Sequence, residues 1–302
     1  MQTAVKSLDP AVLDRLSSLS LVARAVVEGF MAGQHRSSHL GSSVEFAQHR
    51  EYALGDELRR VDWRVFGRSD RLVVKQFVEE ENLVCHLLLD ASESMAYGSM
   101  PWTKLDYARW CASALAHLVL ASRDTAGLVV FDNAYRTKVP PGNGAVQRKS
   151  ILDVLEASKP VGATSVGPVL KWLAPKLKRR GIVCIFSDFF DDPAEILAGV
   201  KLLLSGKHEP ILFQILDPEE LSFDFQSLLK LEGLEQSGIH KIDPRAIRTA
   251  YLAEIQRHNT ELARAARALS VDFVPIQTST PLDAALSTYL AHRMARVRGG
   301  RH

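Results

Sequence analysis

Short apolar runs alternate with amphipathic stretches along the chain from residue 83 onward. Five runs are predominantly apolar at consecutive positions and are bounded by polar or turn-forming residues: 83–89, 127–131, 182–186, 211–216 and 271–276. Consecutive apolar positions, unlike alternating ones, indicate strands that are buried on both faces, as in a parallel sheet. We therefore expect five strands in this part of the chain.

Helical patterns separate the predicted strands. Between the first two strands, apolar residues recur at the three- and four-residue spacing of one helix face: Leu105, Ala108, Ala112, Leu115 and Val119. Later helices are predicted to begin where a capping side chain precedes proline, at Asp192-Pro193, Asp243-Pro244 and Thr280-Pro281. This alternation predicts an α/β fold with a doubly wound, mostly parallel sheet between two helical layers, a Rossmann-type three-layer arrangement.

Two segments depart from the alternation. Residues 221–242 hold two β-compatible stretches around Ser237-Gly238, which predicts an inserted two-stranded β-ribbon. Near the amino terminus, Asp9-Pro10 begins a predicted helix that runs to about Met31, and an Arg-rich segment follows. Residues 72–77 are a predicted strand that pairs antiparallel beside the main sheet. We expect three parts, which are an amino-terminal helical and β extension (1–81), the main domain (82–295) and a basic tail (296–302).

The composition is that of an ordinary globular protein. Hydrophobic residues make up 46% of the 302 positions and charged residues 24%, which suffices for a sizeable core. The formal net charge of +2 is too small to indicate a particular partner. The 3 cysteines are scattered, and two lie in apolar runs, which favours reduced thiols in a reducing compartment. Because no apolar stretch is long enough to span a bilayer, we expect a cytoplasmic protein without an integral membrane segment.

Oxygen-bearing side chains follow the predicted strands. Asp90 ends the first strand, and Ser92 and Ser94 follow it at alternate positions. Asp188 ends a later strand, and Thr164 lies in a small-residue loop that opens a helix. Ligands of doubly wound sheets bind beyond the carboxyl ends of the strands, where such residues meet. Hard oxygen donors suit Mg²⁺ or Mn²⁺ and not zinc. The alternative is that the hydroxyls only cap helices and the second aspartate only ends a strand.

The combined pattern, D-x-S-x-S followed by a threonine and a strand-terminal aspartate, resembles the metal-ion-dependent adhesion site of von Willebrand factor A domains. The resemblance implies that Ser92, Ser94 and Thr164 bind the ion through their hydroxyls. It also implies that Asp90 and Asp188 act on the ion directly or through water. All five positions match. In the adhesion family an acidic side chain of a partner fills the open coordination position, so the resemblance implies a metal-dependent protein interaction.

The segment at 33–82 resembles the signature of the bacterial domain-of-unknown-function fifty-eight family. The matching residues are His35, Gly41, Glu45-Phe46, Arg50-Glu51-Tyr52, Gly55-Asp56, Arg59, Asp62-Trp63-Arg64, Arg68 and Lys75. The resemblance continues through the metal loop to Arg293. It implies a von Willebrand A-like protein that acts with a MoxR-type AAA+ ATPase in assembling or maturing protein complexes, with a client protein that the sequence does not name.

The same segment mixes basic and acidic residues. Eight basic residues between Arg36 and Lys75 stand against six acidic ones, whereas a nucleic-acid stripe should be plainly basic. One interpretation is an amphipathic helix that packs on the main domain. The other is that Arg59, Trp63 and Arg64 form part of a partner-binding surface, since Arg and Trp are enriched at binding hot spots.

These observations favour a metal-dependent protein-interaction module, an adaptor or co-chaperone of a MoxR-type ATPase, over an enzyme. The alternative is a Mg²⁺-dependent hydrolase or phosphotransfer enzyme that uses the same metal site. The sequence has no G-x-x-x-x-G-K-[ST] loop, no G-x-S-x-G elbow and no evident histidine base for Ser92 or Ser94. We therefore expect no catalytic residue, Mg²⁺ or Mn²⁺ as the cofactor, and no nucleic-acid partner.

Overall fold

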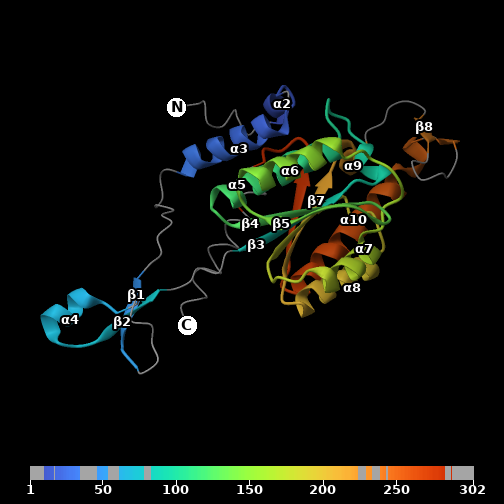
Figure 1. Ribbon diagram of the computed structural model, residues 1–302. Helices are drawn as coiled ribbons and strands as arrows, with labels where there is room; N and C mark the ends of the chain where they lie inside the picture. Colours follow the sequence, from blue (N-terminus) through green and yellow to red (C-terminus); the bar gives the residue numbers. More distant parts are fainter. Residues whose placement is uncertain are drawn as a thin grey trace. The chain divides into compact units, whose positions relative to one another are not determined.

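The computed structural model describes residues 10–16, 18–34, 46–53, 61–77, 83–223, 229–232, 239–242, 244–282 and 287. The chain divides into two compact units, residues 1–36 together with 83–302, and residues 37–82. The larger unit thus includes the first helices, which the sequence analysis placed with the rest of the first 81 residues. Figure 1 shows its central sheet with helices on both sides.

A six-stranded sheet forms the centre of the larger unit. Its strands are β3 (Val84–Asp90), β4 (Thr125–Phe131), β5 (Tyr135–Gly142), β6 (Ile182–Ser187), β7 (Glu209–Leu216) and β10 (Asp272–Gln277). Their order is β10-β7-β6-β3-β4-β5, and every neighbouring pair is parallel except β4 and β5. All five predicted strands are confirmed, but β10 lies at the edge of the sheet, where only Ile276 of its six residues is buried. The order of the strands along the chain reverses direction between β3 and β6. Five parallel strands and one antiparallel edge make the sheet mostly parallel, as predicted.

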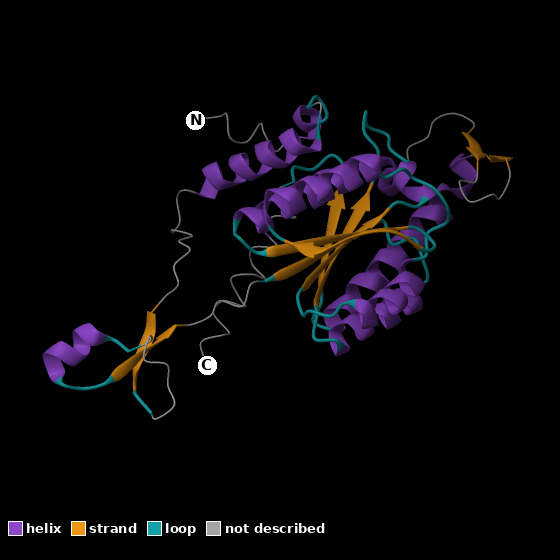
Figure 2. Cartoon of the chain, viewed as in Figure 1, coloured by secondary structure: helices purple, strands orange, loops and turns teal. Residues whose placement is uncertain are grey.

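Helices cover both faces of the sheet (Figure 2). The helices of the larger unit are α2 (Pro10–Leu13), α3 (Leu19–Gln34), α5 (Lys104–Ala121), α6 (Gly144–Ala157), α7 (Val166–Leu173), α8 (Pro193–Ser205), α9 (Pro218–Ser222) and α10 (Pro244–Ala268). Short 3₁₀ turns, η2 (Glu93–Ala96) and η3 (Ala174–Lys176), follow β3 and α7. The arrangement is a three-layer α/β fold.

The alternation of side chains along β3 explains the two cores. Cys85, Leu87 and Leu89 point to one face, where they pack in one cluster with residues of α3, α5 and α6. Leu88 points to the other face and packs in a second cluster with residues of α7, α8 and α10. Since β3 is covered on both sides, its residues have to be apolar at consecutive positions. Burial on both faces therefore explains the apolar run at 83–89.

Local capping explains where several helices begin. Thr103 and Asp106 form a reciprocal capping box at the start of α5. Asp192 accepts a hydrogen bond from the backbone N–H of Ala194 and caps α8, as predicted. The helix α10 begins at Pro244, as predicted, while Asp243 lies outside the described residues. The helix predicted after Thr280-Pro281 also falls on residues that are mostly outside the described part.

The expected insertion after β7 is present. Strands β8 (Leu229–Glu232) and β9 (Ile239–Ile242) pair antiparallel, with Leu229 opposite Ile242, so the predicted β-ribbon is confirmed. The predicted turn at Ser237-Gly238 lies outside the described residues. None of the helices in the described part of the chain is long and apolar enough to cross a membrane.

The smaller unit differs from the prediction. Strand β2 (Val73–Phe77) pairs antiparallel with β1 (Phe46–Glu51) and not with the main sheet, so the predicted pairing beside the main sheet is wrong. The helix α4 (Trp63–Ser69) lies between them in sequence and is capped by Asp62, whose carboxylate accepts from two backbone N–H groups. The partner strand β1 has a mixed sequence, FAQHRE, without the apolar run that identified the central strands.

The amino-terminal helix is also interrupted. The sequence predicts one helix from about residue 10 to about Met31, but α2 ends at Leu13 and α3 begins at Leu19. The hydroxyl of Ser18 accepts a hydrogen bond from the N–H of Leu21 at 3.4 Å. Serine side chains favour helix starts over helix interiors, which explains why a new helix begins here. Val22 and Val26 of α3 belong to the same apolar cluster as α5.

A buried histidine lies inside β3. His86 is 5% exposed, its Nε2 lies 3.3 Å from the carbonyl oxygen of Arg179, and its ring centroid lies 5.9 Å from that of His208. Burial lowers the pKa of His86 to about 4. The hydrogen bond with the backbone carbonyl of Arg179 acts in the opposite direction, and the charges of His208, Lys138 and Arg179 act in the same direction as burial. The buried His86 is therefore uncharged at neutral pH.

Replacing His86 with Gln should make stability less dependent on pH. The pKa of a histidine in the unfolded chain is about 6.5, so the unfolded state binds the proton before the folded state does. As the pH falls from about 7 to about 4, the wild type should lose about 3 kcal/mol that the variant keeps. Urea unfolding of both proteins across this range measures the difference. A gap between the two proteins that stays constant with pH would contradict the buried neutral histidine.

Candidate functional site

The five predicted site residues lie at the carboxyl edge of the sheet. Asp90 is the last residue of β3, and the other four lie on the loops that follow β3, α6 and β6. Residues of the first two loops are joined by backbone hydrogen bonds, from the N–H of Glu93 to Gly162 O (2.8 Å) and from the N–H of Val161 to Ala91 O (2.9 Å). These bonds fix the loop that carries Thr164 against the loop that carries the two serines. A doubly wound sheet thereby brings residues that are about seventy positions apart into contact.

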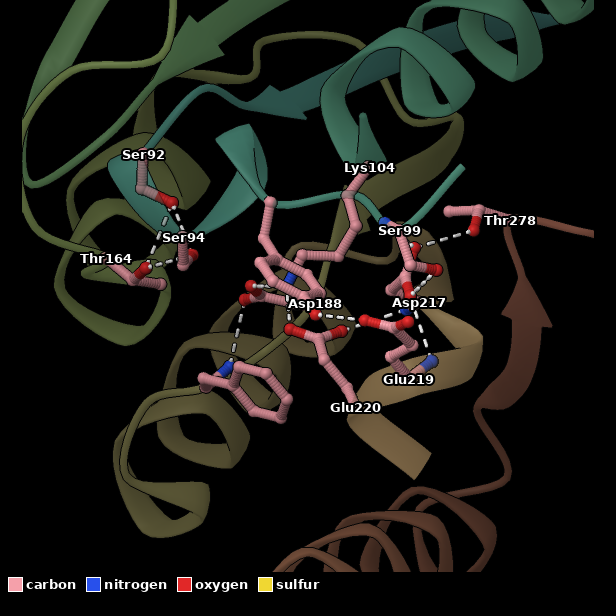
Figure 3. A network of polar contacts seen from close by, with 12 residues as sticks. Ser92, Ser94, Ser99, Lys104, Thr164, Asp188, Asp217, Glu219, Glu220 and Thr278 are labelled. Atoms are coloured by element: carbon pink, nitrogen blue, oxygen red, sulfur yellow. Dashed lines mark hydrogen bonds and ion pairs between the residues drawn. The ribbon is translucent and has the colours of Figure 1, made fainter. Parts of the chain in front are cut away.

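Three hydroxyl groups form a closed triangle (Figure 3). The Oγ atoms of Ser92 and Ser94 are 3.1 Å apart, Ser94 Oγ is 3.0 Å from Thr164 Oγ1, and Thr164 Oγ1 is 2.9 Å from Ser92 Oγ. We call this set the hydroxyl triangle. Ser92 is completely buried. It directly precedes η2, and its backbone is extended there, with φ of −69° and ψ of 164°. Its side chain makes no helix-capping hydrogen bond, so the capping alternative does not account for it.

Asp90 lies directly behind this loop and is completely buried. Its Oδ1 accepts from the N–H of Ser92 at 2.9 Å, and its Oδ2 accepts from the hydroxyl of Ser187 at 2.5 Å. Burial, together with the charge of Asp188, raises the pKa of Asp90 to about 7, although these hydrogen bonds act in the opposite direction. The carboxyl group of Asp90 is thus held in place by the loop that follows β3 and by the hydroxyl of Ser187.

Asp188 follows β6, which pairs parallel with β3 so that Leu89 lies opposite Phe186. This register places both aspartates at the same edge, as the sequence predicts. Asp188 Oδ1 accepts from the N–H of Phe190 at 3.2 Å, and Oδ2 accepts from Nζ of Lys104 at 2.8 Å. Asp188 is itself completely buried.

Lys104 is the site residue that the sequence analysis missed. Its side chain is 0% exposed, and besides Asp188 its Nζ contacts Glu220 Oε1 at 2.6 Å and the Phe190 ring at 5.0 Å from the centroid. Burial alone would lower the pKa of Lys104, but the two carboxylates raise it above its ordinary value. Lysine at the first position of α5 opposes the helix dipole, and this is the one local signal in the sequence that its charge has another partner.

Acidic residues of α9 continue the network from Lys104 (Figure 3). Asp217 caps α9 and accepts hydrogen bonds from the N–H of Ser99 at 2.9 Å, the Ser99 hydroxyl at 2.5 Å and the Thr278 hydroxyl at 3.3 Å. The hydroxyl of Tyr97 donates to Glu219 Oε2 at 3.0 Å. The loop after η2, α9 and the end of β10 are therefore tied together beside the hydroxyl triangle.

The donor set of the site is made of oxygen atoms. Among the described residues, no three His, Cys, Asp or Glu side chains converge in a way that could hold a metal ion. The groups that remain for a hard cation are the hydroxyl triangle and the carboxylates of Asp90 and Asp188. Hydroxyl and carboxylate oxygens are ligands of Mg²⁺ and Mn²⁺, and not of soft metals.

The predicted partner-binding residues belong to the smaller unit. Arg59 lies outside the described residues. Trp63 is 57% exposed, and its ring centroid lies 6.1 Å from that of Phe66 in an edge-to-face arrangement. Arg64 is exposed, and its backbone N–H donates to Asp62 at 3.0 Å. A partner contact at these residues stays a prediction.

Replacing Lys104 with Met should destabilise the protein strongly. The substitution leaves Asp188 and Glu220 buried without their cation, and breaking a buried ion pair on one side costs about 3–5 kcal/mol. The matched control is Lys149→Met, which removes an exposed pair with Asp153 and should cost at most about 1 kcal/mol. Urea unfolding in EDTA measures both changes. Equal losses in the two variants would mean that the Lys104 pairs contribute nothing beyond a surface ion pair.

Solved structures with a similar chain path include proteins from several bacteria. BatB from Bacteroides thetaiotaomicron has a TM-score of 0.48 at 17% sequence identity, over 71% of this chain and 99% of that chain. An aerotolerance-related membrane protein from Bacteroides fragilis has a TM-score of 0.44 at 16% identity, over 68% of this chain and 96% of that chain. The pilus adhesin SpaC from Lactobacillus rhamnosus GG has a TM-score of 0.45 at 11% identity, over 72% and 31% of the two chains.

Relatives in sequence are found in mycobacteria. Uncharacterized protein Rv1480 of Mycobacterium tuberculosis (strain H37Rv) is 25% identical over 297 residues, which cover 97% of this chain and 93% of the relative. Uncharacterized protein Mb1516 of Mycobacterium bovis matches with the same identity and coverage. The family model described as "Protein of unknown function DUF58" matches residues 48–261, which is more than half of the chain. The protein therefore belongs to the DUF58 family.

Proposed function

We propose that the protein is a metal-dependent protein-interaction module of the von Willebrand A-like type. In this proposal Mg²⁺ or Mn²⁺ binds at Ser92, Ser94, Thr164, Asp90 and Asp188, and a partner protein supplies an acidic side chain to its open position. The observation that carries the proposal is the hydroxyl triangle at the carboxyl edge of the sheet, next to two buried aspartates.

The hydroxyl triangle has the dimensions of one face of an octahedral Mg²⁺ site. Mg²⁺ binds oxygen at about 2.0–2.1 Å in octahedral geometry, so neighbouring ligand oxygens lie about 2.9 Å apart. The three oxygen–oxygen distances in the triangle are 3.1, 3.0 and 2.9 Å. Hydroxyl groups at this spacing need little movement to become ligands. Both the chemistry of the donors and their spacing therefore fit a small, hard divalent ion.

The two aspartates suit contact with the ion through water better than direct contact. Both oxygens of Asp90 already accept hydrogen bonds, from Ser92 and Ser187. Both oxygens of Asp188 are engaged as well, by Phe190 and Lys104. Mg²⁺ keeps several water ligands in most protein sites, and such waters can bridge to carboxylates held in this way.

The charges around the site favour an anionic partner group. The hydroxyl ligands are neutral, and the ammonium of Lys104 offsets the charge of Asp188 at 2.8 Å. A divalent ion at the triangle would therefore keep an excess of positive charge, which favours a carboxylate in the remaining position. The residues of this chain orient and partly neutralise the site, and the partner completes it.

As the partner we propose a MoxR-type AAA+ ATPase, for which the protein acts as adaptor or co-chaperone when client complexes are assembled or matured in the cytoplasm. This part of the proposal is supported by the resemblance of residues 33–82 to the family signature. Trp63 and Arg64, together with Arg59, are proposed as a second contact with the same partner, since exposed Trp and Arg residues are typical of binding hot spots.

Metal binding should depend on the hydroxyl triangle and not on the fold. Ser94→Ala and Thr164→Ala each remove a ligand from a half-buried loop, so both should lose the binding of Mg²⁺ in calorimetric titration while urea unfolding in EDTA changes little. The matched control is Ser150→Ala, a half-buried serine of α6 whose hydroxyl donates to the carbonyl oxygen of Val146, which should bind like the wild type. Heat of binding that is the same in all four proteins would overturn the metal assignment.

Partner binding should require the ion. In a titration with a MoxR-type ATPase, EDTA or Thr164→Ala should weaken the complex by a few kcal/mol, a typical hot-spot magnitude. Thr164 is a cleaner probe than Asp188, because loss of Asp188 also removes a partner of buried Lys104. Replacing the partner's acidic residue with its amide should give the same loss. If the affinity is unchanged in EDTA and in Thr164→Ala, the metal site serves something other than this partner.

A further inference from the structure

A second surface feature lies toward the opposite end of the same sheet. A hollow of about 250 Å³ is lined by residues 86–87 of β3, 127–129 of β4, 138–141 of β5, and 176–179 of the segment that leads into β6. His86 and Gly127 are paired across β3 and β4 at its floor, four residues before Asp90 and Phe131 are paired at the carboxyl edge. The hollow is therefore separate from the hydroxyl triangle. Its walls are mostly apolar and include Val139 and Leu177.

Positive charge surrounds this hollow. Four of its lining residues are basic and exposed: Lys138, Lys176, Lys178 and Arg179. No lining residue in the described part of the chain is acidic. None of the four cations forms an ion pair with another described residue, whereas Lys149 and Lys171 on nearby helices do. We call the hollow and these four cations the basic hollow.

Two exposed aromatic side chains extend the basic hollow along the edge of the sheet. Tyr135 at the start of β5 and Trp172 in α7 are 40% and 44% exposed, and their rings stack with centroids 5.1 Å apart. Nζ of Lys176 lies 3.5 Å from the centroid of the Trp172 ring, so the aromatic pair and the hollow share this lysine. Tyr, Trp and Arg are the residue types enriched at protein-binding hot spots, and the aromatic pair and Arg179 supply all three.

We propose that the basic hollow and the Tyr135–Trp172 pair bind an acidic segment of a partner protein. One apolar side chain of that segment inserts into the hollow, and Asp or Glu residues on either side of it pair with the four cations. The volume carries this choice, because pockets for drug-sized ligands measure about 300–1,000 Å³, while the hollow is smaller and has the size for a single side chain.

The charge pattern distinguishes an acidic protein segment from nucleic acid. A nucleic-acid site needs a basic stripe that follows many successive phosphates. Here the cations surround one apolar hollow, and the whole chain has a formal net charge of only +2. Complementary charges at such a rim mainly speed association and set specificity, while the buried apolar anchor slows dissociation.

Three fluorescein-labelled peptides test the proposal by fluorescence anisotropy with the full chain in EDTA. The first is Glu-Glu-Phe-Glu-Glu between glycine spacers, the second has Gln for every Glu, and the third has Ala for Phe. EDTA removes metal-dependent carboxylate binding at the hydroxyl triangle, so this outcome is independent of the proposed function. The first peptide should bind, and each of the others should bind at least about tenfold more weakly, which corresponds to about 1.4 kcal/mol.

Matched charge reversals locate the binding. Lys138→Glu combined with Lys178→Glu should weaken the first peptide at least about tenfold. The control, Lys201→Glu combined with Lys207→Glu, makes the same change in net charge at exposed lysines outside the hollow and should bind within about twofold of the wild type. Trp172→Ala should weaken binding without unfolding the protein, since the side chain is partly exposed.

Several outcomes would overturn the proposal. Equal binding of the Phe and Ala peptides would show that the apolar hollow takes no side chain. An equal loss in the control variant would show a general charge effect and no defined site. Displacement of the first peptide by a short single-stranded DNA with higher affinity would assign the surface to nucleic acid instead. Normal metal binding alongside any of these results would leave the metal proposal standing by itself.

Discussion

The buried ammonium of Lys104 is the interaction on which the carboxyl edge of the sheet depends. It lies between Asp188, which follows β6, and Glu220, which belongs to α9 after β7, and it comes from the first turn of α5 after β3. One charge therefore joins three segments, each of which follows a different strand of the sheet. Because Lys104 and Asp188 are completely buried and Glu220 is mostly shielded from water, moving one of the three groups leaves another without its partner. Among the proposed metal ligands, Asp188 is held directly by this charge, while the loops that carry Ser92, Ser94 and Thr164 are joined by backbone hydrogen bonds.

Parts of the fold and the candidate site that depend on local sequence are predictable. The strands β3, β4, β6 and β7 are buried on both faces, and their burial is visible in the sequence as runs of consecutive apolar residues. Asp90 and Asp188 are recognisable because they end such runs abruptly. The doubly wound topology then places the ends of neighbouring parallel strands at one edge, and the observed pairing of β3 with β6 confirms that step. The contact of Ser92 and Ser94 with Thr164 depends in addition on the backbone hydrogen bonds that join the loop after α6 to the loop after β3.

Features that depend on contacts between distant residues are not predictable in this way. In the sequence, Lys104 looks like any other polar residue at a helix start, because the two carboxylates that pair with it are 84 and 116 positions away. The strand β5 escapes prediction because only Val139 among its eight residues is buried, so it shows neither an apolar run nor a regular alternation. Strand β2 is recognisable as a strand, but its partner depends on β1, whose mixed sequence gives no sign of it.

The edge strand β5 also determines how the sheet meets other molecules. Pro140 and Pro141 lie near the end of β5, and proline has no N–H that could donate a hydrogen bond to an incoming strand. The amide of Gln147 donates to the carbonyl oxygen of Pro140 at 2.8 Å, which occupies an acceptor that another chain could otherwise use. Backbone pairing is thus discouraged at this edge. Contacts along this edge are consequently left to side chains, and copies of the chain are hindered from joining edge to edge into fibres.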